Sequence, residues 1–130
     1  MNRNTGIRYQ ETHEWAWQDD DEIVVGITDY AQSTLSDIVY VELPEVGETF
    51  ARGEQFGVVE SVKAAADVYM PMSGKIVAVN EELEDRPELI NEDAFGRGWM
   101  IRISPTNMAE WKELLDINGY KKVIEEESAH

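Results

Sequence analysis

Short apolar runs, each bounded by glycine, proline or acidic residues, recur along this chain. Two of them, Gln55–Ser61 and Ala65–Tyr69, contain the β-branched residues Val58, Val59 and Val68 and lie close together in sequence. Apolar β-branched runs of this length joined by a short link predict a β-hairpin. Comparable patterns predict further strands at 7–17, 23–27, 38–43, 75–79 and 99–103.

Helical signals flank these strands. Thr28 is placed to cap a helix that ends at Leu35, with Asp29 at the positive end of the helix dipole. Asn107 is a second possible cap. The pattern therefore predicts helices at 28–35, 108–115 and 116–126, and one helical turn at 87–90.

The segments on either side of the hairpin mirror each other. A glycine-bearing turn and a strand precede it, and a strand, Pro71, Gly74 and another strand follow it. Such related halves favour a flattened barrel or sandwich. We therefore expect one domain, residues 1–130, with an all-β core, short helices and a helical C-terminus.

Charge and cysteine content narrow the function. The 130 residues include 27 acidic and 11 basic ones, a formal charge of −16. This disfavours binding to nucleic acid or an anionic membrane and suits basic protein partners, although acidity can equally serve solubility. With no cysteine, sulfur redox chemistry would need an added group. No signal or membrane segment is visible, so we expect a cytoplasmic protein or a mature organellar one.

Catalytic and metal-binding motifs are missing from the sequence. No nucleophile elbow, phosphate-binding glycine loop or two-histidine metal motif occurs. The histidines are His13 and His130, too few for a usual zinc site. Glu14 adjoins His13, but neighbours on a strand point to opposite faces. We expect no catalytic residue and no metal site.

Lys63 occupies the link between the two hairpin strands. Its neighbours, Val62 and the alanines 64–66, are small or apolar, so nothing there competes for the ammonium group. A turn tip is also among the most accessible positions in a hairpin. Lys63 is therefore either an ordinary surface lysine or an amine presented for modification on a rigid support.

The segment VESVKA at 59–64 resembles the attachment site of lipoyl-carrier proteins, in particular the H protein of the glycine cleavage system. The resemblance extends in sequence order over HEW at 13–15, VGITDYAQ at 25–32, DIVYVELPEVGE at 37–48 and PELINEDAFGRGWM at 87–100. It implies a fold of the lipoyl/biotinyl-carrier type and lipoate joined by an amide to Lys63.

The resemblance also implies a carrier, not an enzyme, in glycine catabolism and one-carbon metabolism. Such a carrier takes the aminomethyl group of glycine from a pyridoxal-phosphate glycine decarboxylase (P protein) to a folate-dependent aminomethyltransferase (T protein). Dihydrolipoyl dehydrogenase (L protein) then restores the disulfide, and a lipoate-attaching enzyme adds the cofactor beforehand. A monomer is expected for a carrier that visits several active sites.

Arm-docking residues are implied by the same resemblance. Glu14 and Asp67 match acidic positions beside the docked arm, and Thr12 replaces a residue that is commonly serine in the family. Ala66 stands where many members carry serine, which removes one possible hydrogen bond. Without the resemblance, Glu14 and Asp67 would be read as surface carboxylates.

The same resemblance suggests a recognition residue for the lipoate-attaching enzyme and an apolar wall for the docking cleft. Glu60, which lies three residues before Lys63, is a candidate for recognition by the lipoate-attaching enzyme. Apolar residues of the VGITDYAQ region could form one side of the docking cleft or serve only in the core: Ile27, Ala31 and Leu35.

Several alternatives remain open at the level of sequence. Biotinyl domains usually flank their lysine with methionine, and 2-oxoacid dehydrogenase lipoyl domains usually carry aspartate before it, whereas Val62 and Ala64 flank Lys63. An H-like protein that mainly relays lipoyl to other proteins is also compatible. An unmodified acidic binding module and an independent hydrolase rank last.

Overall fold

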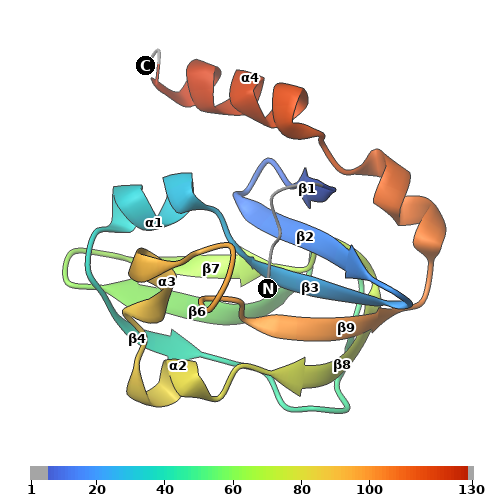
Figure 1. Cartoon of the computed structure of the whole chain (residues 1–130), viewed down its shortest axis with the longest axis horizontal. Coiled ribbons are helices and arrows are strands. Elements are labelled where there is room, and N and C mark those ends of the chain that lie inside the picture. Colours follow the sequence, from blue (N-terminus) through green and yellow to red (C-terminus); the bar gives the residue numbers. More distant parts are fainter. Residues whose placement is uncertain (1–5, 129–130) are drawn as a thin grey trace.

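The computed structural model describes residues 6–128, which form two β-sheets with short helices around them and a longer helix near the C-terminus (Figure 1). The larger sheet has the strand order β1-β2-β3-β9-β8-β5, and the smaller has the order β4-β6-β7. In chain order the strands are β1 (Ile7–Tyr9), β2 (Glu14–Asp19), β3 (Glu22–Ile27), β4 (Ile38–Glu42), β5 (Thr49–Phe50), β6 (Gln55–Ser61), β7 (Ala65–Tyr69), β8 (Gly74–Val79) and β9 (Ile101–Pro105).

The helices lie mostly where polar and glycine-containing segments connect the strands. They are α1 (Asp29–Leu35), α2 (Glu82–Asp85), α3 (Leu89–Glu92), the 3₁₀ helix η1 (Met108–Glu113) and α4 (Ile117–Ser128). None of the helices in this described part is both long and apolar enough to cross a membrane.

The predicted hairpin is confirmed residue for residue in β6 and β7. The predicted caps are also present. Thr28 Oγ1 accepts a hydrogen bond from the Ala31 N–H at 3.1 Å, and Asn107 Oδ1 accepts one from the Ala109 N–H at 3.2 Å.

Other predicted elements differ in extent or type. The strand predicted at 7–17 is two strands, because a turn closed by His13 N–H and the Gln10 carbonyl (3.0 Å) separates β1 from β2. His13 has φ of 79°, which an extended strand does not allow. The helix predicted at 108–115 is the 3₁₀ helix η1. The short helix α2 had no clear signal in the sequence.

The main core lies between the two sheets. Alternate side chains of β3, Ile23 and Val25, face it together with Val41, Val59 and Val68 of the small sheet. All five are buried. Two sheets packed through one apolar layer give the flattened sandwich that the sequence predicted.

A second apolar cluster lies on the opposite face of the large sheet. Val24 alternates with its two neighbours on β3 and packs with Tyr9, Trp15 and Tyr120. Tyr120 belongs to α4, which crosses this face above β1 and β2 (Figure 1). The large sheet is therefore covered on one face by the small sheet and on the other by α4.

Candidate functional site

Lys63 lies at the tip of the hairpin between β6 and β7, at one end of the small sheet (Figure 1). The strands are in register through Val59 with Ala66 and Glu60 with Ala65, and the Ser61 N–H donates to the Ala64 carbonyl at 2.7 Å. The Lys63 side chain is exposed. The predicted position of the amine on a structured turn is thus observed.

Ser61 holds the backbone of this turn. Its Oγ accepts hydrogen bonds from the N–H groups of Ala64 (3.1 Å) and Lys63 (3.3 Å). The turn is also bonded to the residue just before β4, because the Val62 N–H donates to the Asp37 carbonyl at 3.0 Å. The sequence analysis did not single out Ser61, although a serine that bonds to the backbone two residues further on is a known turn signal.

A cavity of about 130 Å³ opens between α1 and the hairpin. The apolar residues that the sequence associated with a cleft, Ile27, Ala31 and Leu35, line one side of it, and Val59 and Val68 line the other. Its wall includes Ala66, three residues after Lys63, or roughly 10 Å along an extended strand. A group could therefore reach this cavity from Lys63 only on a long arm.

Three predicted polar residues, Thr12, Glu14 and Asp67, also line the cavity. Asp67 is exposed at its rim, and its Oδ1 accepts a hydrogen bond from Gln55 Nε2 at 3.1 Å. Thr12 directs its hydroxyl to the Glu14 carboxylate. The structure thus brings together residues that are up to 55 positions apart in the chain.

Glu14 is buried, with 1% of its surface exposed, and is not a surface carboxylate. Its Oε1 accepts hydrogen bonds from Thr12 Oγ1 and Gln10 Nε2 (2.8 Å), and its Oε2 accepts one from the Tyr69 N–H (3.0 Å). Burial raises the pKa of Glu14 above its ordinary value, although these hydrogen bonds act in the opposite direction. Gln10 was not identified from the sequence, because its role depends on where its amide points.

His13 turns away from Glu14 and contacts α4. Its Nδ1 lies 2.7 Å from the Tyr120 hydroxyl, and its Nε2 lies 2.8 Å from a Glu127 carboxylate oxygen. Burial raises the pKa of Tyr120 to about 12, so its phenol keeps its proton near neutral pH. His13 and Glu14 therefore form no acid–base pair. The other histidine, His130, lies outside the described residues.

Glu60 is exposed on β6 and lies opposite Tyr40 of β4 and Ala65 of β7. Because Val59 faces the cavity, Glu60 points to the other side of the small sheet. Within residues 6–128, no three His, Cys, Asp or Glu side chains gather to hold a metal ion.

Comparisons with known proteins identify the family of the chain. Residues 7–127 match the model of a family described as the glycine cleavage H-protein. The chain belongs to the glycine cleavage H-protein family. It is accordingly a lipoyl carrier of the glycine cleavage system and not an enzyme, which confirms the resemblance found in the sequence.

Named relatives agree over nearly their full lengths. The glycine cleavage system H protein of Thermus thermophilus is 54% identical over 120 residues, which cover 92% of this chain and 94% of that protein. The H protein of Shewanella woodyi is 53% identical over 122 residues, covering 93% and 95%. Family membership removes the biotinyl domain and the 2-oxoacid dehydrogenase lipoyl domain as alternatives.

The fold agrees as well. The crystal structure of a glycine cleavage system H protein from Mycobacterium marinum superposes with a TM-score of 0.83 at 40% identity, covering 90% of this chain and 94% of that one. The predicted fold class, an all-β core with helical additions of the lipoyl-carrier type, is confirmed.

Proposed function

We propose that Lys63 carries lipoate through an amide bond and that the chain transfers the aminomethyl group of glycine between enzymes. The transfer runs from the glycine decarboxylase to the aminomethyltransferase, and dihydrolipoyl dehydrogenase then reoxidises the carrier. The observation that carries this proposal is the exposed Lys63 amine on a turn fixed by Ser61. Bound lipoate would supply the redox-active disulfide that a chain without cysteine lacks.

The turn presents the amine without restraining it. Backbone N–H groups around Lys63 donate to Ser61 Oγ and to the Asp37 carbonyl, which fixes the backbone on both sides of Lys63, while its side chain stays in solvent. An enzyme that modifies the amine therefore meets a defined backbone and a mobile nucleophile. Ordering a turn beforehand lowers the entropy cost of binding.

The cavity fits the proposed cofactor in its chemistry. Its aliphatic wall suits a hydrocarbon arm with a sulfur-containing ring, and excluding water there protects a hydrolysable group. Glu14 and Asp67 would attract a cationic nitrogen and favour its protonated form. Because the Thr12 hydroxyl donates its hydrogen bond to the Glu14 carboxylate, we assign Thr12 the role of orienting that carboxylate.

Glu60 is a separate part of the proposal. It is exposed close to Lys63 on a face that leads away from the cavity. We propose that the lipoate-attaching enzyme contacts it. The substitution Glu60→Gln should then slow lipoylation, and unchanged kinetics would remove this role.

The first test is the intact mass of the protein, with peptide mapping, after incubation with a lipoate-attaching enzyme, ATP and lipoate. We expect one lipoyl group, confined to Lys63. Lys63→Arg should take up none while keeping the circular dichroism spectrum of the wild type. Modification of a different lysine, or none on folded protein with an enzyme active on a control substrate, would contradict the proposal.

A second test separates glycine cleavage from lipoyl relay. The lipoylated chain should support turnover of glycine by the decarboxylase, and the Lys63→Arg variant should not. A lipoylated chain that is inactive with the decarboxylase but donates lipoyl to another protein would instead indicate the relay role.

The family match over residues 7–127 supports the proposal that residues 1–130 act as one domain.

A further inference from the structure

Large apolar side chains are exposed next to the lysine turn. Val39, Tyr40 and Val62 are 53%, 51% and 67% exposed. They belong to two segments, β4 and the turn itself, that meet at one end of the small sheet. Exposed apolar groups that cluster in this way often mark an interaction surface.

A β-bulge in β4 is responsible for two of these side chains. Ile38 pairs with Ser61 and Tyr40 pairs with Glu60, so Val39 is an extra residue between two successive positions of β6. In a regular strand, one of two neighbouring side chains would point into the core. The bulge instead leaves both Val39 and Tyr40 exposed, between the buried Ile38 and a buried Val41.

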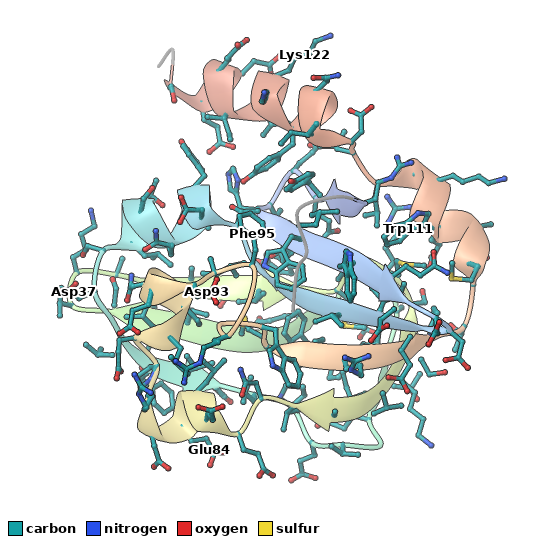
Figure 2. The ribbon with its side chains drawn as sticks, viewed as in Figure 1. Asp37, Glu84, Asp93, Phe95, Trp111 and Lys122 are labelled. Atoms are coloured by element: carbon teal, nitrogen blue, oxygen red, sulfur yellow. The ribbon has the colours of Figure 1, made fainter. Side chains whose placement is uncertain are left out.

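The third side chain is tied to the same place by the backbone. The Val62 N–H donates to the Asp37 carbonyl, and Figure 2 shows Asp37 at the end of the molecule where the β6–β7 turn lies. Val39, Tyr40 and Val62 are called the bulge patch below. Exposed carboxylates surround it: Asp37, Glu42 and Glu60.

We propose that the bulge patch is the docking surface for the enzyme that attaches lipoate to Lys63, an inference that rests on the function proposed above. In that reaction the Lys63 amine replaces the AMP of an ATP-activated lipoate, so that an amide forms and AMP and a proton leave. The enzyme must therefore bring its active site to the Lys63 nitrogen itself. Its contact surface has to include what adjoins the turn.

Other partners face no such requirement. They act at the far end of the finished arm and can dock at a distance from the lysine turn. The patch also indicates the chemistry of its partner, because an apolar centre with a carboxylate rim is complemented by an apolar surface with a basic rim.

The test compares substitutions that remove apolar surface at exposed positions. Tyr40→Thr and Val39→Thr keep a residue suited to a strand, and the double variant combines them. Val46→Thr is the matched control, since Val46 is 60% exposed but follows the opposite end of β4. Steady-state lipoylation with saturating lipoate and ATP gives kcat and KM for each unmodified chain.

We expect Tyr40→Thr to raise KM about tenfold with kcat nearly unchanged, because docking weakens while the chemistry at Lys63 stays the same. The double variant should exceed either single one, and Val46→Thr should match the wild type. Thermal unfolding of each chain confirms that it is folded.

Three outcomes would overturn the inference. They are an unchanged KM in the folded double variant, an equal rise in KM for Val46→Thr, and a defect that appears only in decarboxylase turnover by chains lipoylated beforehand. The last would assign the patch to a different partner. Failure of the wild type to be lipoylated on Lys63 would instead contradict the proposed function.

Discussion

At the scale of the residue, Glu14 connects the two sheets. It begins β2 of the large sheet and accepts a hydrogen bond from the Tyr69 N–H of β7 in the small sheet. Gln10 strengthens the connection, because its Nε2 also donates to the Tyr69 carbonyl at 3.2 Å. Burial nevertheless raises the pKa of Glu14, so its ionised form carries a cost in the folded state.

That cost predicts a pH dependence. A carboxyl whose pKa is raised on folding contributes stability that is fully present below its ordinary value of 4.5 and is lost as pH rises through the folded value. Glu14→Gln cannot titrate and loses one acceptor. The variant should therefore be less stable than the wild type by an amount that is larger near pH 4 than near pH 7.

Urea unfolding at both pH values measures this difference. Glu11→Gln controls for the removal of a charge, because Glu11 is an exposed side chain in the same turn. A deficit for Glu14→Gln that grows toward pH 7 would mean that the hydrogen bonds to the carboxylate outweigh its burial.

At the scale of the element, Tyr120 is the buried residue through which α4 packs on the large sheet. The Tyr120 ring stacks on Tyr9 with centroids 4.6 Å apart, and its hydroxyl lies 2.6 Å from Thr28 Oγ1 and 2.7 Å from His13 Nδ1. Thr28 caps α1, and His13 lines the cavity. The position of α4 is thereby linked to the elements that form the cavity.

Removing the Tyr120 hydroxyl should loosen α4. Tyr120→Phe keeps the stacked ring but removes the contacts of its hydroxyl with Thr28 Oγ1 and His13 Nδ1, which we expect to cost about 1–3 kcal/mol of the free energy of unfolding. Hydrogen exchange should accelerate across Ile117–Ser128 more than in β6 and β7. Tyr40→Phe serves as the control, since its side chain is 51% exposed. Equal stability of Tyr120→Phe and the wild type would show that the Tyr120 hydroxyl does not help to hold α4.

At the scale of the whole molecule, the packing of the two sheets and the net charge affect stability in separate ways. The two sheets are held by apolar packing, whereas the chain as a whole carries 27 acidic against 11 basic residues. Some carboxylates are paired, such as Asp19 and Glu22 with Arg102 at 2.9 and 3.2 Å. The excess of −16 still predicts net repulsion between surface charges in the compact state.

Salt should therefore stabilise the protein. Raising NaCl from about 0.01 M to about 1 M shortens the screening length from about 30 Å to about 3 Å and weakens that repulsion. We expect the midpoint of thermal unfolding to rise by a few degrees. Chloride is preferred to sulfate, because sulfate also strengthens apolar burial. A fall in the midpoint would show that ion pairs such as those of Arg102 dominate.

The sequence by itself determined the elements whose signals are local. The apolar runs of β6 and β7 need only their own residues and a short link, and the caps at Thr28 and Asn107 bond to N–H groups two or three residues away. The exposed amine of Lys63 follows from its place between the two strands. The assignment of the chain to the lipoyl carriers came from the resemblance and was confirmed by the family match, whereas the attachment of lipoate to Lys63 stays a proposal.

Tertiary structure alone decided the environment of these residues. The burial of Glu14 depends on a contact with Tyr69, 55 positions away, and the exposure of both Val39 and Tyr40 depends on how β4 pairs with β6. The contact of the His13 ring with Tyr120 of α4 likewise joins residues that are distant in the chain. Local patterns specify secondary structure, but burial and strand register are set when remote segments pack against one another.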